Sequence, residues 1–307
     1  TLTHRFLKTA MLNLFIKANM MKILVTGYNG QLGYDVIKEL HSRGIDCLGA
    51  DKDDFDITNE KETLKAITEY SPSAVIHCAA YTAVDRAEDD EETCRRVNVD
   101  GSKNIALACA SLGCKMVYIS TDYVYGGKGE APFEPSSPTD PCNVYGKTKL
   151  EGEKQVQKYC KKSFIVRTSW VFGINGGNFV KTMLRLSESH DTLTVVSDQI
   201  GSPTYTPDLA RLICDMVVTE KYGIYHGTNE GCCSWAEFAA EIMKSAGKDT
   251  KIIPILTKDY KCAAERPLNS RLSKKCLDDA GFERLPTWQN ALERYMKELD
   301  LNNGCRI

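Results

Sequence analysis

The sequence lacks a block of basic residues, because its 39 Lys and Arg are balanced by 41 Asp and Glu and the net charge is −2. A surface for nucleic acid needs clustered positive charge, so that class of function is excluded. Internal repeats, low-complexity tracts and long linkers are also absent. Hydrophobic residues make up 42% of the 307 residues and charged residues 26%, which is typical of a soluble globular protein with a large core.

The thirteen cysteines form no C-x-x-C motif and no paired clusters with zinc-ligand spacing. The sequence contains no other pattern of metal ligands. A scattered, odd-numbered set indicates buried or free thiols in a reducing compartment. We therefore expect a cytoplasmic protein without a structural metal.

Residues 1–20 differ from the rest of the chain, because they contain basic and apolar residues but no acid. They are too few and too charged to span a membrane, and no membrane partner is expected. Two interpretations stay open: an amphipathic transit-like segment, or an appended or mis-started leader before Met20-Met21. We favour the leader, since the first credible strand follows at once.

A glycine-rich turn follows the first buried strand, which is predicted over 22–26. The turn carries three equally spaced glycines, Gly27, Gly30 and Gly33, and leads into a helix. A second strand over 46–50 ends at Asp51. Strand, turn, helix, strand and acid in this order predict a dinucleotide site, with the pyrophosphate at the helix N-terminus. The alternative is a tight turn that binds nothing.

Acidic and small residues follow the next strands. Asp51 could accept hydrogen bonds from the adenosine ribose and so favour NADH, although Lys52 beside it could soften that preference. Asp56 and Ile57 could bracket the adenine, or Asp56 could form a cap or Asx turn before the next helix. A third strand over 74–78 precedes Ala80-Tyr81-Thr82, where small residues let a cofactor pass close to the backbone.

Tyr145 and Lys149 are four residues apart, hence one turn apart on one helix face. An ammonium beside a phenol lowers the pKa of the phenol, which would help Tyr145 to protonate a carbonyl oxygen as hydride arrives at the carbon. Thr121 follows the fourth strand, predicted over 115–119, and can reach the same oxygen. The alternatives are an exposed helix face for the pair and a Ser/Thr turn for Thr121.

Three further features point to a sugar nucleotide. Asp122 could bind a sugar hydroxyl, and Trp170 could pack on a sugar ring or a base, although core packing is its main alternative. The loop over 126–141, rich in Gly, Pro and Ser, is typical of a flap over a site. Arg266 and Arg271 could bind a diphosphate, or they could simply be solvated at the surface.

The alternation of strands and helices predicts an α/β fold: a Rossmann-type doubly wound parallel sheet with a smaller C-terminal α/β substrate domain. We assign 21–168, together with about 190–220, to the dinucleotide-binding domain. Residues 169–307 form mainly the substrate-binding region, and the two are interleaved.

The three motifs Gly27-x-x-Gly30-x-x-Gly33, Ser120-Thr121-Asp122 and Tyr145-x-x-x-Lys149 resemble those of the extended short-chain dehydrogenase/reductases. Within that class the sequence is most similar to the dTDP-4-dehydrorhamnose reductase family. The similarity covers 21–299 in order and rests on the runs 80–85, 120–124, 143–152, 167–171, 178–185, 198–204 and 266–272.

The resemblance implies reduction of the C4 ketone of dTDP-4-dehydro-L-rhamnose by NADH or NADPH. It makes Tyr145 the proton donor, Lys149 the residue that orients the nicotinamide ribose, and Thr121 a hydrogen-bond donor to the reacting oxygen. Asp122 and Trp170 would bind the sugar. The cofactor would be lined by Gly30, Gln31, Leu32, Asp51, Asp56, Ile57, Ala80, Tyr81 and Thr82. The family also includes members with magnesium at a subunit contact, so magnesium and a homodimer are left open.

Two departures from related patterns bear on the activity. Tyr81 stands where the family sometimes has histidine, which leaves the chemistry of that cofactor contact open. Tyr123 stands where 4,6-dehydratases carry an acid, and this argues against water elimination. The competing hypotheses are another nucleotide-sugar epimerase or reductase, and a non-catalytic regulatory subunit resembling that of methionine adenosyltransferase.

Overall fold

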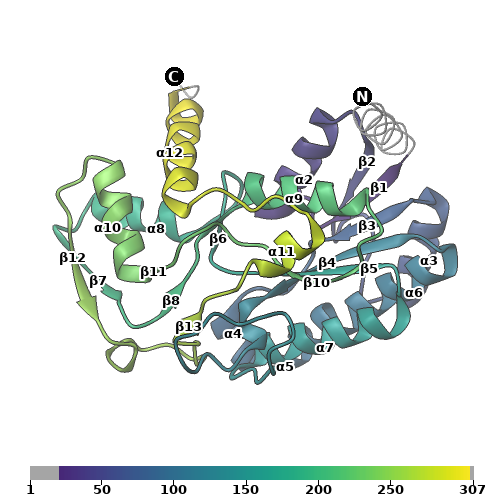
Figure 1. Ribbon diagram of the computed structural model, residues 1–307, viewed down its shortest axis with the longest axis horizontal. Coiled ribbons are helices and arrows are strands. Elements are labelled where there is room, and N and C mark those ends of the chain that lie inside the picture. The colour runs from purple at the N-terminus through teal and green to yellow at the C-terminus, as the bar shows by residue number, and fades with distance from the viewer. Residues whose placement is uncertain (1–20, 305–307) are drawn as a thin grey trace, which may run out of the picture.

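A computed structural model describes residues 21–304, so the predicted leader over 1–20 lies outside the described residues. At its centre is a sheet of six strands that all pair in parallel (Figure 1). In spatial order these are β10 (Gly223–His226), β5 (Ser163–Thr168), β4 (Lys115–Thr121), β3 (Ala74–His77), β1 (Lys22–Thr26) and β2 (Asp46–Ala50). The prediction of a doubly wound parallel sheet is confirmed.

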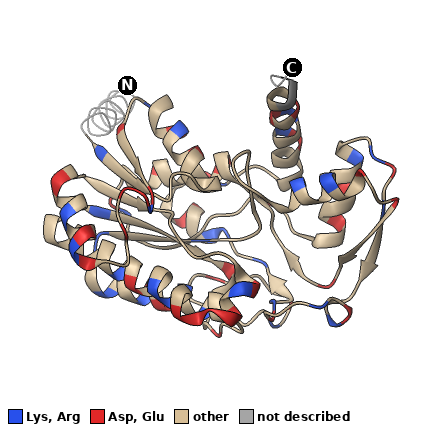
Figure 2. Ribbon diagram, turned by 180° about the vertical axis from the view of Figure 1, so that it is seen from behind, with Lys and Arg blue, Asp and Glu red and all other residues tan. Residues whose placement is uncertain are grey.

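Helices cover both faces of this sheet. One face carries α2 (Gln31–Ser42) and α9 (Thr206–Val217), and the other carries α3 (Glu60–Tyr70), α6 (Ser102–Leu112) and α7 (Val144–Tyr159). Basic and acidic residues are interspersed along these helices (Figure 2). Within residues 21–304, no helix is both long enough and apolar enough to cross a membrane.

Shorter elements join these helices. A π-helical segment, Arg96–Gly101, joins α5 (Glu91–Arg95) to α6. The remaining short helices are α4 (Val84–Asp89), α11 (Lys275–Ala280) and the 3₁₀ turns Asp122–Val124 and Thr257–Asp259.

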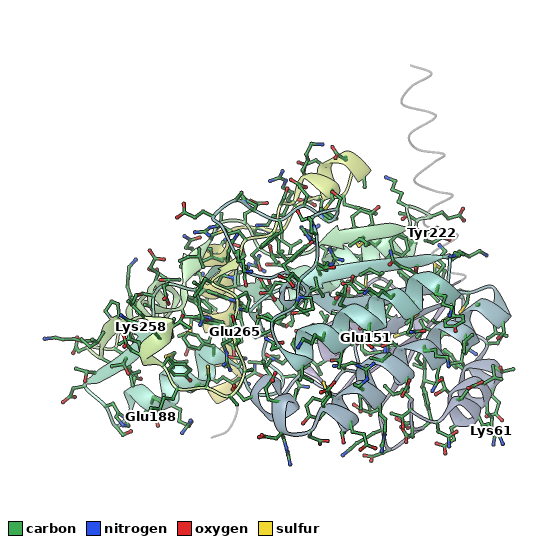
Figure 3. The ribbon with its side chains drawn as sticks, turned by 90° about the horizontal axis from the view of Figure 1, so that it is seen from below. Lys61, Glu151, Glu188, Tyr222, Lys258 and Glu265 are labelled. Atoms are coloured by element: carbon green, nitrogen blue, oxygen red, sulfur yellow. The ribbon has the colours of Figure 1, made fainter. Side chains whose placement is uncertain are left out.

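A second group of elements packs around its own hydrophobic cluster, which includes Phe172, Phe238 and Tyr295. Its helices are α8 (Phe179–Ser187), α10 (Trp235–Ser245) and α12 (Trp288–Gly304). Its strands pair as β6 (Val171–Phe172) with β9 (Thr204–Tyr205), β7 (Thr192–Val196) with β12 (Lys251–Ile255), and β8 (Ile200–Gly201) with β11 (Cys233–Ser234) and β13 (Asn269–Ser270). Figure 3 places Glu188 and Lys258 of this group at the opposite end of the molecule from Lys61.

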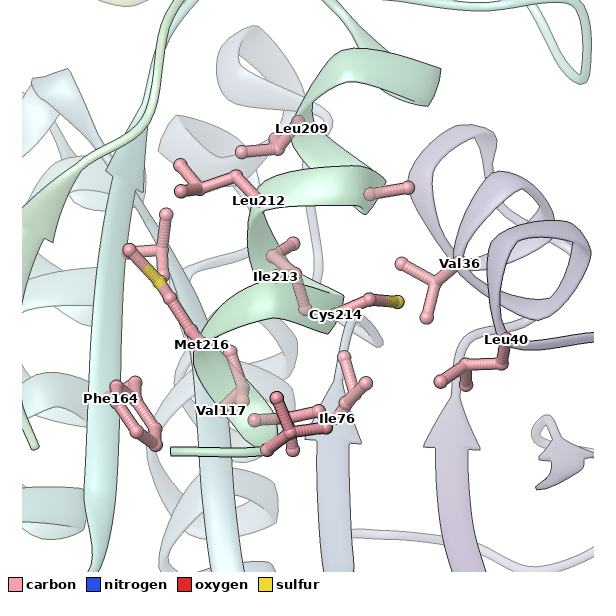
Figure 4. Packing of buried hydrophobic residues seen from close by; sticks show 14 of the residues in the cluster. Val36, Leu40, Ile76, Val117, Phe164, Leu209, Leu212, Ile213, Cys214 and Met216 are labelled. Atoms are coloured by element: carbon pink, nitrogen blue, oxygen red, sulfur yellow. The ribbon is translucent and has the colours of Figure 1, made fainter. Parts of the chain in front are cut away.

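The core of the larger part is built from alternating strand residues. Ile23 and Val25 of β1 pack under α2 and α9, whereas Leu24 packs under the helices of the other face. On α9, Leu212 and Ile213 are fully buried between α2 and the strands (Figure 4). Because both faces are covered, the carboxyl ends of the strands remain as the natural place for a ligand.

Candidate active site

A cavity of about 780 Å³ lies at the carboxyl ends of the central strands and extends to the second group of elements. This volume is in the range of cofactor and small-molecule sites. The predicted site residues that line it are Gly27, Gly30, Gln31, Leu32, Gly33, Asp51, Asp56, Ile57, Ala80, Thr82, Thr121, Asp122, Tyr145, Lys149 and Trp170. Of the residues predicted to bind the cofactor, Tyr81 does not line this cavity.

The glycine-rich turn brings backbone rather than side chains to the cavity. Gly27 has a φ of +70°, and a Cβ atom there would lie 2.6 Å from the amide nitrogen of Ala79. Gly30 is the N-cap of α2 and provides no side-chain hydrogen bond to the first turn. The N-terminal N–H groups of α2, beside Gln31, are therefore free to bind an anion, so this turn fits the pyrophosphate of a dinucleotide.

The predicted adenosine end of the cavity is acidic. The carboxylate of Asp51 accepts hydrogen bonds from the backbone N–H groups of Asn29 (3.3 Å) and Lys52 (2.8 Å), which hold it at the end of β2. Asp56 forms an Asx turn with Thr58 and also lines the cavity, so the two interpretations of Asp56 are compatible. The N-cap of α3 is Asn59.

Tyr81 is held by Asn98, which lies in the π-helical segment between α5 and α6. Its N–H donates to the side-chain oxygen of Asn98 (2.9 Å), and the Asn98 amide donates back to its carbonyl (3.1 Å). The same amide donates to Thr148 of α7 (3.1 Å), next to Lys149. Asn98 therefore ties the loop after β3 to the helix that carries Lys149, and its place inside a helix was the signal in the sequence.

Tyr145 and Lys149 both lie in the first half of α7, as the spacing predicted. Asn143 is the N-cap of this helix and accepts a hydrogen bond from the N–H of Gly146 (2.8 Å). The Lys149 amine is buried, and it lies 4.1 Å from the centroid of the Tyr118 ring. Thr121 ends β4 and lines the same cavity, so both hydroxyls and the amine converge on one space.

Burial decides the charge of these groups. It raises the pKa of Tyr145 above its ordinary value, and the Thr121 hydroxyl opposes part of that rise. Burial also lowers the pKa of Lys149 to about 7. The expected lowering of the Tyr145 pKa is therefore not found, because burial of the phenol outweighs favourable neighbours. Tyr145 keeps its proton at neutral pH, as a proton donor must.

Asp122 and Tyr123 follow Thr121. Asp122 is buried, its carboxylate accepts a hydrogen bond from Thr121 (3.0 Å), and burial raises its pKa to about 6. The Tyr123 ring packs edge-on against the Tyr145 ring, with centroids 5.7 Å apart. The position after Asp122 thus supplies an aromatic contact to Tyr145 and no second acid.

At the other end of the cavity, Trp170 stacks on Trp235, the first residue of α10, with ring centroids 3.7 Å apart. Trp170 has a φ of +49°, a strained backbone that large residues rarely adopt. A Cβ atom at Gly201 would lie 2.7 Å from the Trp170 indole, so only glycine fits there. Sequence reasoning found Trp170 but missed Trp235, since no local pattern links the two.

Two expectations about the surroundings differ from the structure. Among the described residues that line the cavity, none belongs to the loop 126–141, which packs instead against the segment near Leu272 through Phe133. Arg266 also lies outside the lining and forms a two-point ion pair with Asp85. Within residues 21–304 there is no group of three or more His, Cys, Asp or Glu that could hold a metal.

A parallel sheet whose glycine-rich turn and Tyr-Lys helix open on one cavity defines the class of extended short-chain dehydrogenase/reductases. Comparison with known proteins narrows this class. Residues 21–301 match the family described as RmlD substrate binding domain, and the chain belongs to that family.

Curated relatives and solved structures agree with this assignment. The chain is 41% identical to a spore coat polysaccharide biosynthesis protein, SpsK, of Bacillus subtilis, over 91% of this chain and 98% of that protein. It is 40% identical to a dTDP-4-dehydrorhamnose reductase of Aggregatibacter actinomycetemcomitans, over 89% and 98%. The crystal structure of a dTDP-4-dehydrorhamnose reductase from Bacillus anthracis in complex with NADP has a TM-score of 0.89 and 41% identity, covering 91% of this chain and 99% of that one.

Proposed function

We propose that this protein reduces the C4 ketone of dTDP-4-dehydro-L-rhamnose to dTDP-L-rhamnose with NADPH or NADH. The observation that carries the proposal is the convergence of Thr121, Tyr145 and Lys149 on a cavity whose far end is a glycine-rich helix N-terminus. Relatives with the name of this reductase, one of them solved with NADP, support it.

In this mechanism each residue acts at one atom. Bound nicotinamide supplies the hydride to C4. The Tyr145 hydroxyl donates its proton to the ketone oxygen as the C=O bond becomes C–OH. The Thr121 hydroxyl, which donates to Asp122 in this structure, would turn its single proton toward the same oxygen. Lys149 orients the nicotinamide ribose. The ketone becomes a neutral alcohol, and Tyr145 is left as a phenolate that regains a proton from solvent.

The two groups of elements divide the ligands between them in this proposal. The larger part holds the cofactor, with Gly27 to Gly33 on its pyrophosphate and Asp51 on its ribose. Of the predicted range of about 190–220, α9 packs in this part, whereas β7, β8 and β9 belong to the second group. Asp122 and Trp170 hold the sugar, and the region 169–307 supplies most of the substrate site. We place the enzyme in the cytoplasm, since all twelve cysteines in the described residues are free. A homodimer stays a prediction.

The test is oxidation of NADH and of NADPH in the presence of dTDP-4-dehydro-L-rhamnose. We expect turnover with at least one cofactor, and a loss of about 100-fold or more in Tyr145→Phe, which removes the proton donor. Tyr159→Phe is the matched control, because this tyrosine lies at the other end of α7 and outside the cavity lining. Turnover of Tyr145→Phe at the wild-type rate would refute the role of Tyr145.

The alternative of a non-catalytic regulatory subunit predicts a different result. Folded protein would bind a reduced nicotinamide cofactor but turn over no dTDP-ketosugar, and it would co-purify with a partner. An epimerase would interconvert dTDP-sugars without net oxidation of the cofactor. These outcomes separate the three hypotheses in one set of assays.

A further inference from the structure

A buried ion pair lies one helical turn from Lys149. Glu153, on the same helix α7, binds Arg167 of β5 at two points, with Arg167 Nε 2.9 Å from Oε1 and Nη2 2.6 Å from Oε2. Both side chains are almost fully buried, at 2% and 3% exposure. Removing two charges from water costs free energy, and a packed apolar pair of similar volume often stabilises a fold equally well. The stability of the fold therefore does not by itself explain this buried ion pair.

The same carboxylate is joined to the wall of the cavity. Ser120 donates a hydrogen bond to Glu153 Oε1 (2.5 Å), and Ser120 lines the cavity directly before Thr121. Ser120 and Arg167 are partners in the register of β4 and β5. Glu153 is therefore fixed from two neighbouring strands at once, and its charge has one defined position relative to Lys149.

The other donors of Arg167 are also engaged. Its Nη1 donates to the Tyr125 hydroxyl (2.6 Å) and to the carbonyl of Pro135 (3.0 Å). The Tyr125 hydroxyl in turn hydrogen-bonds His226, whose pKa burial lowers to about 3, so this ring is neutral. Arg167 thus anchors the carboxylate and the loop 126–141 together.

Apart from Glu153 and its partner Arg167, the groups around the Lys149 amine are neutral at pH 7. Burial raises the pKa of the Cys78 and Cys94 thiols and of the Tyr118 and Tyr145 hydroxyls, and it lowers the pKa of His77 to about 3. Among the described neighbours that act on this amine, Glu153 is the carboxylate, and its charge opposes the effect of burial on the Lys149 pKa. A buried amine without such a partner loses its proton readily.

We propose that Glu153 is a positioning residue: its carboxylate, fixed by Arg167 and Ser120 one helical turn from Lys149, increases the fraction of the buried Lys149 amine that is charged near neutral pH. The charged amine can donate three hydrogen bonds, whereas the neutral one donates two and offers a lone pair instead. The catalytic consequence, orientation of the nicotinamide ribose by Lys149, rests on the proposed function. The effect on the charge of Lys149 does not.

The test measures the protonation of Lys149 directly, by NMR titration of protein with ¹³C-labelled lysine. The Lys149 signal is assigned by its loss in Lys149→Met. Glu153→Gln should lower the titration midpoint of Lys149 by about 1 pH unit or more, the scale expected for a charge one helical turn away. The alkaline limb of the pH–kcat profile should move in the same direction.

Glu151→Gln is the matched control. Glu151 (Figure 3) is on the same helix α7, two residues from Glu153, and it pairs with Arg95, with 35% and 43% of the two side chains exposed. Glu151→Gln should leave the Lys149 midpoint within about 0.3 pH unit, because solvent screens this partly exposed pair. A merely structural role of the buried pair would change stability but not this midpoint.

A second variant covers the case in which Glu153→Gln does not fold, since loss of one partner leaves Arg167 buried without its counter-charge. Glu153→Gln/Arg167→Met removes both charges and should lower the Lys149 midpoint by less than Glu153→Gln does, because loss of the Arg167 cation favours the charged amine. A midpoint that does not fall in Glu153→Gln, or in the double variant where only that one folds, overturns the proposal. A lowered midpoint in protein that reduces no dTDP-ketosugar would instead keep the role of Glu153 and refute the proposed function.

Discussion

Burial, more than direct contact between charges, decides which groups at this site carry charge. Tyr145 keeps its proton because a phenolate would lose its hydration, and the pKa of Lys149 falls to about 7 for the equivalent reason. The amine is therefore charged below that pH and loses its proton as the pH rises through it. Burial raises the pKa of Asp122 to about 6, because it disfavours the charged carboxylate just as it disfavours the charged amine of Lys149.

At Asp51 the structure supports a prediction about cofactor choice. Its carboxylate is oriented by two backbone N–H groups and faces the cavity, so it can accept hydrogen bonds from ribose hydroxyls and would repel a 2′-phosphate. Asp51→Ala should weaken NADH by about 10-fold or more, the scale of a lost hydrogen bond to a charged group, and should weaken NADPH less.

The measurement is the Kd of each reduced cofactor, followed by its fluorescence on binding. Asp53→Ala is the control, because it removes a neighbouring charge that does not line the cavity. Equal losses of NADH and NADPH in Asp51→Ala would mean that Asp51 does not contact the ribose.

Among the elements, the helix from α5 to α6 shows how one residue interrupts a regular structure. The π-helical segment contains Asn98, whose side chain forms hydrogen bonds with both backbone groups of Tyr81 and with Thr148. π-helical turns of this kind are frequent at functional sites. Here the segment links the loop after β3 to α7. The positions of these two walls of the cavity are therefore fixed relative to each other.

Asn98→Ala removes these bonds and leaves the Tyr81 N–H and carbonyl without partners inside the protein. We expect the free energy of unfolding to fall by about 2–4 kcal/mol, since each buried polar group without a partner costs about 1–3 kcal/mol. Urea denaturation measures this loss.

Asn104→Ala provides the comparison on the same helix, because the Asn104 amide makes one hydrogen bond, to the Ile57 carbonyl (2.9 Å). Its loss should be about 1 kcal/mol. If both variants lost the same free energy of unfolding, the hydrogen bonds of Asn98 would stabilise the fold no more than the single bond of Asn104.

For the whole molecule, the site depends on how the two groups of elements meet. Trp170 comes from the loop after β5, and Trp235 comes from α10, whose N-terminus is fixed by a capping box between Ser234 and Glu237. Their stack holds the plane of Trp170 although its backbone is strained. The end of the cavity at Trp170 therefore forms only when both groups are in place.

Trp235→Ala should raise the KM for the dTDP-sugar by about 3- to 10-fold, since an aromatic pair contributes about 0.5–1.5 kcal/mol. The Kd of the cofactor should not change. Circular dichroism gives an independent readout, because two indoles at 3.7 Å couple and the coupled band should vanish in the variant.

Trp288→Phe is the control for that band, because Trp288 is the remaining tryptophan and lies outside the main cavity. A coupled band that survives in Trp235→Ala would contradict the stack. An unchanged KM would show that the stack does not position Trp170 for substrate.

The sequence by itself determined four strands of the central sheet, the glycine-rich turn and the helical spacing of Tyr145 and Lys149. These features follow from local periodicity, turn chemistry and spacing, which act over a few residues. Because parallel strands end at one edge of a sheet, strand order along the chain was enough to bring Asp51, Thr121 and Tyr145 to a single cavity.

Only the tertiary structure decided which distant side chains meet and how deeply they are buried. It paired Trp235 with Trp170, Glu153 with Arg167 and Arg266 with Asp85, and it packed the loop 126–141 away from the cavity. It also reversed the expected direction of the Tyr145 pKa. Contacts between residues far apart in the chain leave no periodic signal, and desolvation depends on every element that covers a group.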